Sequence, residues 1–124
     1  MAKILVVDDD PFNLKLALTV LEQAGHEVRG AGGGAEGVAA AQADPPDLVL
    51  MDVQMPGVDG LEALRRLRAD PRTVALKVVA FTALAMKGDA ERLLAAGFDG
   101  YLEKPMRYKE FLASVAGLLQ GAGG

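Results

Sequence analysis

Short apolar segments alternate with helix-like segments along the whole chain. Five segments that are apolar or bounded by turn residues predict strands at 3–7, 26–30, 47–51, 77–81 and 100–104. Residues 48–51 (LVLM) contain no polar side chain, which is typical of a strand buried on both faces of a parallel sheet. The segment HEVRG at 26–30 is polar and predicts an edge strand.

Apolar residues recur at helical spacing between these strands. The first helix follows Asp10 and Pro11, which suit an N-cap and a first helical position, and Gly25 ends it. Its apolar positions are Leu14, Ala17, Leu18 and Leu21. Further helices are predicted at about 35–43 and 86–96, and apolar positions mark two more, one at Leu61, Leu64 and Leu67 and the last at Phe111, Val115, Leu118 and Leu119.

Strands that alternate with helices predict a parallel sheet with helices on both of its faces. We therefore expect an α/β protein with a doubly wound sheet built from five βα units. The expected single domain covers residues 1–124, with a core at about 3–119 and a flexible tail at 120–124.

Composition narrows the classes of function. A chain of 124 residues with 51% hydrophobic content can bury the core of one domain. Its net charge of -4 and its lack of a basic run argue against nucleic-acid binding, and the absence of cysteine excludes disulfides and thiolate metal sites. No apolar segment approaches the roughly 20 residues of a membrane span, and the N-terminus is unlike a signal peptide. We expect a cytoplasmic protein that does not bind membranes.

Acidic residues and a lysine follow the predicted strands. Asp8 and Asp9 follow the first strand and Asp52 the third, while Thr82 follows the fourth and Lys104 ends the fifth. The carboxyl ends of parallel strands meet at one edge of the sheet, where such folds place their sites. Mg²⁺ commonly binds one or two carboxylates together with a phosphate, and a lysine can reach the same phosphate. The pattern predicts phosphoryl transfer onto a carboxylate, with Asp52 as the nucleophile.

Four motifs resemble those of the receiver domains of two-component response regulators. They are VVDDDP at 6–11, LMDVQMPGVDG at 50–60, FTAL at 81–84 and GYLEKP at 100–105. The similarity extends from Lys3 to Leu119, and residues 85–97 are similar to DivK-like stand-alone receivers and to receivers of hybrid kinases. The resemblance implies a CheY-like fold, a (βα)5 flavodoxin-like parallel sheet in the order 2-1-3-4-5. Met1 directly before the first strand favours a stand-alone protein, although a domain of a hybrid kinase stays open.

The resemblance also implies a role for each site residue. Asp52 would be the phosphoacceptor, and Mg²⁺, for which Mn²⁺ may substitute, would bind Asp8, Asp9, Asp52 and the backbone carbonyl of Gln54. The switch residues would be Thr82 and Tyr101. Lys104 would contact the phosphoryl group, and its bond to Pro105 would be cis.

The implied function is a phosphorylation-activated switch in a phosphorelay. The donor would be a histidine kinase or a histidine phosphotransfer protein, and the only catalysis would be self-phosphorylation and slow autodephosphorylation. A downstream protein would bind at about residues 85–119, since the chain shows no DNA-binding output domain. The chain would be a monomer or a phosphorylation-linked dimer.

Three other functions are each compatible with part of the sequence. The segment GAGGGA at 30–35, with Asp52 about 20 residues on, fits a dinucleotide-binding motif, but it follows a polar second strand rather than a first strand. A Mg²⁺-dependent aspartyl phosphatase would need a general acid and room for a substrate, and Gln54 stands where many such enzymes carry a second aspartate. A constitutive scaffold would bind its partner without phosphorylation.

Several conspicuous residues have ordinary structural interpretations. His26 follows a helix-ending glycine and is expected to be an exposed loop residue rather than a phosphoacceptor. Arg65, Arg66 and Arg68 are expected to form a solvated helix face, and Phe81 is expected to belong to the core.

Overall fold

Five parallel strands form one sheet in the computed structural model, which describes residues 2–82, 89–103 and 107–121. The order β2-β1-β3-β4-β5 confirms the predicted doubly wound topology and the edge position of the second strand. The strands are β1 (Lys3–Val7), β2 (Glu27–Ala31), β3 (Leu48–Met51), β4 (Val78–Thr82) and β5 (Gly100–Glu103).

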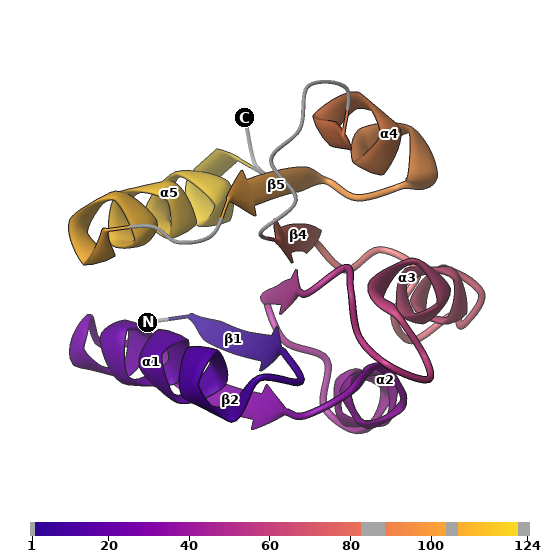
Figure 1. Cartoon of the computed structure of the whole chain (residues 1–124), viewed down its shortest axis with the longest axis horizontal. Helices are drawn as coiled ribbons and strands as arrows, with labels where there is room; N and C mark the ends of the chain where they lie inside the picture. The colour runs from indigo at the N-terminus through magenta and orange to yellow at the C-terminus, as the bar shows by residue number, and fades with distance from the viewer. Residues whose placement is uncertain (1, 83–88, 104–106, 122–124) are drawn as a thin grey trace.

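The helices cover both faces of the sheet (Figure 1). Helices α1 and α5 lie on one face, while α2, α3 and α4 lie on the other. Their bounds are α1 (Pro11–Gln23), α2 (Gly34–Ala43), α3 (Gly60–Arg68), α4 (Asp89–Ala96) and α5 (Tyr108–Gly121). Within residues 2–82, 89–103 and 107–121, no helix is long and apolar enough to cross a membrane.

The core has two halves because successive strand side chains point to opposite faces. In β1, Ile4 and Val6 pack toward α1 and α5, whereas Leu5 and Val7 pack toward α2 and α3. All residues of β3 are buried, as its apolar sequence predicts. The central strands are thus packed on both faces, so the polar side chains at their carboxyl ends are attached to a rigid backbone.

The ends of several elements differ from the predicted ones by one or two residues. β2 and β4 each begin one residue later, because the ladder pairs Lys3 with Glu27 and Val49 with Val78. α5 continues to Gly121, two residues into the expected tail. The partly buried Leu118, whose carbonyl accepts a hydrogen bond from the Lys77 side chain, supports this last turn. Residues 86–88 of the fourth predicted helix lie outside the described residues.

The start of α1 follows its predicted signals. Pro11 occupies the first turn, and the Asp10 carboxylate accepts hydrogen bonds from the backbone N–H groups of Phe12 at 2.9 Å and Asn13 at 3.4 Å. Asp10 is therefore a helix cap, as its place before Pro11 predicts.

The three arginines of α3 do not form one solvated face. Arg65 and Arg66 are exposed and both donate to Glu62, and these hydrogen bonds lower the pKa of Glu62 to about 2. The expectation is wrong for Arg68, whose side chain is only 26% exposed and reaches backbone carbonyls of other segments. Its position at the last turn of α3 places it over two chain connections, and sequence spacing alone does not show this.

His26 is half-buried rather than exposed. Its backbone N–H donates to the Leu21 carbonyl at 3.2 Å, and the next residue, Glu27, donates to Ala2 at 2.8 Å. These bonds hold the turn after α1 against the start of the sheet. Phe81 is also half-buried, and its ring stacks on Phe111 of α5 with centroids 5.2 Å apart.

Candidate metal centre

The pairing of β1 with β3 brings two acidic segments together. Val7 and Met51, the last residues of these strands, are register partners. The backbone N–H of Asp52 then donates to the Val7 carbonyl at 2.9 Å, which continues the ladder one residue beyond β3. Asp8 and Asp52 therefore leave neighbouring strands at the same level of the sheet edge.

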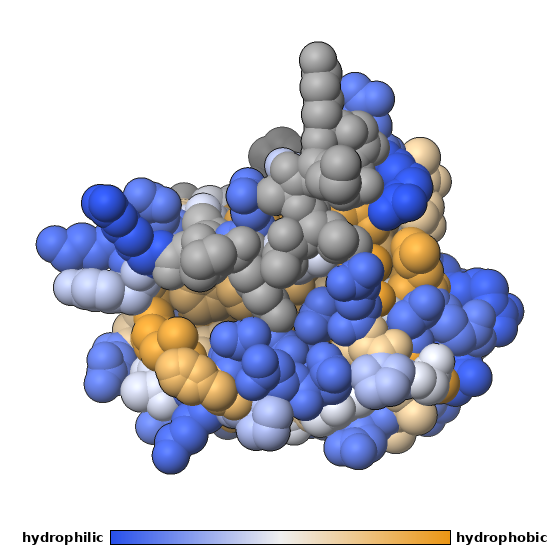
Figure 2. Space-filling view, viewed as in Figure 1, coloured by the Kyte–Doolittle hydropathy of each residue, from blue (hydrophilic) through white to orange (hydrophobic). Residues whose placement is uncertain are grey.

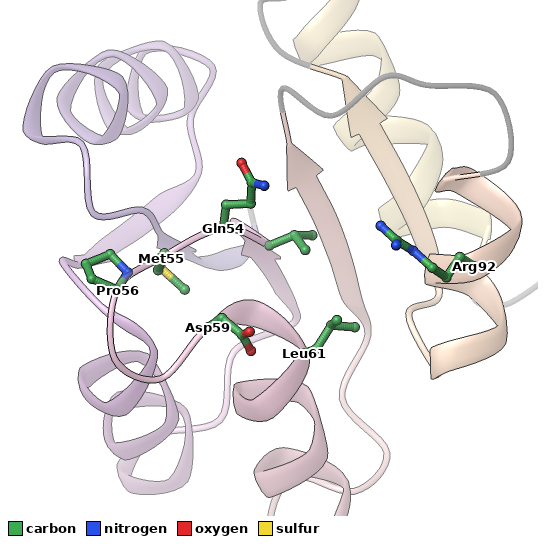
Figure 3. Close-up of a pocket in the computed structure, with 7 residues that line it drawn as sticks. Gln54, Met55, Pro56, Asp59, Leu61 and Arg92 are labelled. Carbon is green, nitrogen blue, oxygen red and sulfur yellow. The ribbon is translucent and has the colours of Figure 1, made fainter.

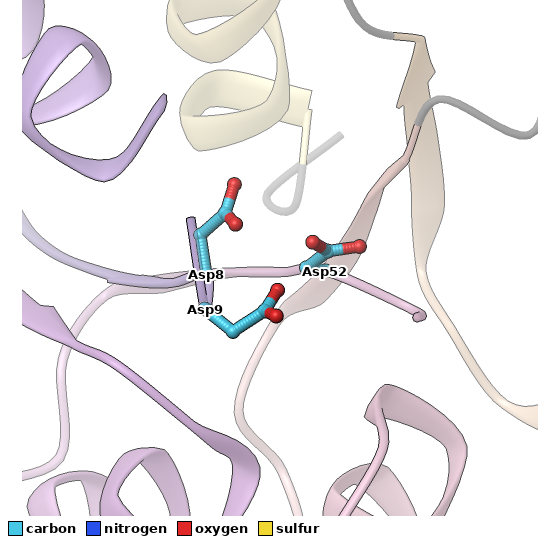
Figure 4. A group of neighbouring side chains, drawn as sticks. All are labelled: Asp8, Asp9 and Asp52. Atoms are coloured by element: carbon cyan, nitrogen blue, oxygen red, sulfur yellow. The ribbon is translucent and has the colours of Figure 1, made fainter. Parts of the chain in front are cut away.

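Three carboxylates share a small space at this edge (Figure 4). One oxygen from each of Asp8, Asp9 and Asp52 lies within 4.8 Å of the other two. Asp8 is 2% exposed and Asp52 is 9% exposed, whereas Asp9 lies at the surface. Burying like charges this close together is unfavourable unless a cation or a proton intervenes. The structure thus brings together the acidic residues that the sequence predicts for the site.

Backbone groups orient the two buried carboxylates. The N–H of Asp10 donates to Asp8 Oδ1 at 2.9 Å, and the N–H of Gln54 donates to Asp52 Oδ1 at 3.1 Å. In each case the donor lies two residues after the acceptor, so the turn that follows each strand orients the carboxylate at the end of that strand. Oxygen donors without nitrogen or sulfur fit a hard divalent cation such as Mg²⁺ rather than zinc. Whether the Gln54 carbonyl is a ligand stays a prediction.

The remaining predicted residues come from the neighbouring strands. Thr82 ends β4 and is 1% exposed, and it pairs with Glu103 of β5. Tyr101 lies in β5 opposite Ala80 and is 37% exposed, so its ring is partly in solvent. Lys104 and the expected cis bond to Pro105 lie outside the described residues. Thr82 and β5 thus reach the same edge as the acidic residues.

Gly60 packs against the backbone of Asp52 and Val53 at the site. The sequence alone did not identify this residue. A Cβ at this position would lie 2.3 Å from the Asp52 carbonyl oxygen and 2.7 Å from Val53 Cα. The Gly60 N–H also donates to the Val53 carbonyl at 3.0 Å. Asp59, which precedes the apolar positions of this helix, could have indicated where α3 begins. Its carboxylate caps the helix by accepting a hydrogen bond from the Glu62 N–H, and this places the first turn of α3 directly under the site.

A cleft of about 580 Å³ opens beside the site, between the loop after β3, the start of α3 and α4 (Figure 3). Gln54, Asp59 and Leu61 line one side, and Arg92 of α4 lies across from them. The sequence did not predict this space, because it depends on how far α4 stands from α3.

Two glycines of the GAGGGA segment have packing reasons. A Cβ on Gly34 would lie 2.1 Å from the Val58 carbonyl oxygen, and one on Gly30 would lie 2.8 Å from Leu18 Cδ1. Gly34 allows the start of α2 to approach the loop after β3 closely, and Gly30 allows α1 to pack on β2. Their presence therefore does not require a bound dinucleotide.

Comparison with known proteins gives a consistent result over nearly the whole chain. Residues 4–116 match the sequence profile of the response regulator receiver domain. The chain is 36% identical over 119 residues to the polar-differentiation response regulator DivK of Brucella ovis, covering 96% of this chain and 97% of that protein. It is 47% identical over 116 residues to the sensor protein GacS of Pseudomonas syringae, but it spans only 13% of that protein's length.

Solved structures show the same architecture. Chemotaxis protein CheY4 of Vibrio cholerae superposes with a TM-score of 0.88 at 29% identity, over 95% of this chain and 98% of that one. The receiver domain of the sensor histidine kinase PA1611 of Pseudomonas aeruginosa gives a TM-score of 0.87 at 32% identity, over 96% and 98%. That structure holds a magnesium ion coordinated in its active-site cleft.

Proposed function

Because this chain belongs to the response regulator receiver domain family, and is a receiver domain of a two-component system, we propose that it carries its signal as a phosphoryl group on Asp52. The observation that supports this most directly is the position of Asp52. Its carboxylate is nearly buried, is oriented by the Gln54 N–H, and lies beside two further carboxylates at the sheet edge.

The proposed step is a nucleophilic displacement at phosphorus. A carboxylate oxygen of Asp52 forms the new O–P bond while the N–P bond of a phosphohistidine breaks, and the departing imidazole nitrogen keeps the electron pair and takes a proton from water. The donor is a histidine kinase or a histidine phosphotransfer protein. The buried platform of β1 and β3 fixes the direction of the carboxylate, which is the protein's main contribution.

A Mg²⁺ ion would be held by Asp8, Asp9 and Asp52, with the Gln54 carbonyl as a further ligand. When bound, it would offset the negative charge of the three carboxylates and of the phosphoryl oxygens. The oxygen-only donor set supports this assignment. Mn²⁺ has similar ligand preferences and should substitute.

Asp9→Asn should weaken Mg²⁺ binding by about tenfold, which corresponds to about 1.4 kcal/mol, because the site loses one of its charged oxygens. Isothermal titration of the wild type and the variant with Mg²⁺ measures this. Asp10→Asn is the matched control, since Asp10 caps α1 and asparagine caps equally well. Equal affinity of Asp9→Asn and Asp10→Asn would remove Asp9 from the ligand set.

The signal would be relayed from Thr82 to the surface formed by about residues 85–119. We propose that Thr82 turns toward the phosphoryl group and that Tyr101 then moves inward from its partly exposed position. A downstream protein would recognise the altered surface. A scaffold that binds without phosphorylation would instead show the same partner affinity before and after phosphoryl transfer.

An apolar face of α1 lies next to the proposed site and suits contact with the phosphodonor. Phe12 is 66% exposed and Leu16 is 54% exposed, one helical turn apart. Figure 2 shows hydrophobic side chains gathered over α1. Because α1 begins three residues after Asp8, a protein seated on this face would be close to Asp52.

Phe12→Ser should slow phosphotransfer from a phosphorylated histidine kinase by about tenfold, because an exposed aromatic anchor commonly contributes 1–2 kcal/mol to an interface. Phosphorylation by acetyl phosphate, which needs no docking surface, should be unchanged. Val74→Ser is the control, since Val74 is 48% exposed but lies in the connection between α3 and β4. Equal slowing with both donors would point to damage at the site itself.

The function is tested by the mass of the intact protein after incubation with acetyl phosphate, with and without Mg²⁺. A Mg²⁺-dependent gain of one phosphoryl group is expected. Repeated hydrolysis of a phosphate ester, without a stable gain, would favour the phosphatase alternative. Absence of any gain with both acetyl phosphate and a phosphorylated kinase would contradict the proposal.

A further inference from the structure

A groove of about 510 Å³ runs between the outer sides of α2 and α3. The two helices pack side by side on the sheet face opposite to α1 and α5 (Figure 1). The α2 wall of the groove consists of Ala35, Val38, Ala39 and Gln42, which share one side of the helix because their spacing is i, i+3, i+4 and i+7. Val38 is buried, whereas the two alanines are exposed. The groove is separate from the cleft beside Asp52.

Helix α2 lacks the charged outer side that surface helices normally have. Its sequence, GAEGVAAAQA, contains one charged side chain, Glu36, and the Glu36 carboxylate accepts from the Gly32 N–H at 3.4 Å. A helix that is apolar on nearly all sides is normally covered by other protein. Alanine side chains are small, so a further helix can approach α2 to the axis separation of about 8–10 Å that packed helices adopt. The groove therefore suits a helical segment.

The α3 wall of the groove carries an excess of positive charge. Arg65 and Arg66 both donate to the single carboxylate of Glu62, at 2.6 Å and 2.9 Å. Asp70, which lines the groove further along, is paired with Arg72 at 2.8 Å and so does not cancel the remaining charge. One positive charge is thus left at the groove, although the chain as a whole carries a net charge of -4. The groove favours an acidic occupant.

Arg66 is the side chain best suited to recognise that occupant. It is 44% exposed, and within the described residues its one hydrogen bond runs from Nε to Glu62 Oε2 at 2.9 Å. Arg65, in contrast, uses both Nε and Nη2 to bind Glu62. A guanidinium binds a carboxylate through two parallel hydrogen bonds, which makes it selective for carboxylates over other acceptors. The terminal nitrogens of Arg66 keep this capacity at the edge of an apolar groove.

We propose that the groove between α2 and α3 binds an acidic helical segment of a partner protein. Small apolar side chains of the segment pack on Ala35, Val38 and Ala39, and a carboxylate beside them binds Arg66. This is the helix-in-groove mode of recognition, in which the apolar contacts supply affinity and the charged contact fixes orientation. A second copy of this chain is the competing occupant, and the test separates the two.

The position of the groove leaves the α1 face open, because α1 lies on the other face of the sheet (Figure 1). A protein bound at the groove and a phosphodonor on α1 would therefore not compete. Binding at the groove does not depend on the proposed function, and only this simultaneous binding rests on it. A partner that stays bound in this way raises the effective concentration of its attached domains near Asp52.

The test uses two synthetic helical peptides of about 14 residues, or about four turns, each held by a lactam bridge. Both carry alanine and leucine along one side, and the flanking positions are glutamate in one peptide and lysine in the other. Titration into the ¹⁵N-labelled full chain, without a phosphodonor, should give saturable chemical-shift changes at 35–42 and 65–70. The glutamate peptide should bind at least about tenfold more tightly than the lysine peptide, because only its charge complements the groove.

Two variants with matched controls assign the contacts. Ala39→Arg should abolish these shift changes by filling the groove, whereas Ala116→Arg, the same change at an exposed alanine of α5, should not. Arg66→Gln should weaken binding of the glutamate peptide by up to about fivefold, the usual range for one exposed ion pair, and should not weaken binding of the lysine peptide. Lys15→Gln removes the same charge from exposed α1 and should change neither affinity.

Three results would overturn the inference. They are equal affinities of the two peptides, no saturable shift changes at 35–42 and 65–70 at about 1 mM peptide, and a dimer in sedimentation that Ala39→Arg dissociates, since a second copy would then occupy the groove. With the glutamate peptide bound, phosphorylation by acetyl phosphate should proceed within about twofold of the rate of the free chain. A free chain that gains no phosphoryl group would contradict the proposed function and leave the peptide result intact.

Discussion

Asp52→Asn should abolish the Mg²⁺-dependent gain of a phosphoryl group. The amide is a far weaker nucleophile than the carboxylate and removes one negative charge from the site. Asparagine has the same shape, and its oxygen can still accept from the Gln54 N–H, so the loop should keep its conformation. We expect a fall of at least about a hundredfold in phosphorylation rate, measured by intact-protein mass, with a free energy of unfolding no lower than that of the wild type, because the variant relieves repulsion among the three carboxylates.

The control for this variant is Asp10→Asn, which changes a neighbouring acidic residue outside the three-carboxylate group. It should be phosphorylated at the wild-type rate. Phosphorylation of Asp52→Asn at a comparable rate would mean that another side chain accepts the group. Asp8 and Asp9 would then be the residues to replace next.

Gly60→Ala should damage both stability and phosphorylation. The added methyl group would lie 2.3 Å from the Asp52 carbonyl oxygen and 2.7 Å from Val53 Cα, which are backbone atoms that cannot rotate away. Either α3 or the loop after β3 must shift. We expect a loss of about 1–3 kcal/mol in the free energy of unfolding by urea denaturation, together with slower gain of phosphate from acetyl phosphate.

Gly33→Ala is the control for the glycine variant. A Cβ at Gly33 would meet nothing within 4 Å, and its φ of -169° is extended backbone that alanine adopts. Its stability should fall by no more than about 1 kcal/mol, the usual cost of alanine at an N-cap. A Gly60→Ala protein as stable as Gly33→Ala would show that α3 can move away from the site at little cost.

The elements of the sheet could be predicted because each signal was local and repeated. A buried run such as 48–51 and a cap such as Asp10 specify their own elements, and alternation of strand and helix then indicates a parallel sheet covered on both faces. The strand order followed from the resemblance to receiver domains. The acidic site followed from this topology, because parallel strands necessarily place Asp8 and Asp52 at one edge. No side-chain geometry was needed for that step.

The contacts of Arg68 and Gly60 could not be predicted in the same way. Arg68 donates a hydrogen bond to Asp99, which is 31 residues away in the sequence. Arg65 and Arg66 are the same type of residue on the same helix, but their side chains face the solvent. A glycine is needed at position 60 because the start of α3 approaches the backbone of the loop after β3 closely. The distance between these two segments depends on how α3 packs. Both features depend on tertiary packing that periodicity does not encode.

The polar edge strand β2 also bears on how the protein behaves at high concentration. An unpaired strand edge can add strands from other molecules and start aggregation, and charged side chains on the edge oppose this. β2 carries Glu27 and Arg29, and Arg29 is held by the Asp44 carbonyl at 2.6 Å. Intermolecular β-pairing is thereby disfavoured at this edge of the sheet.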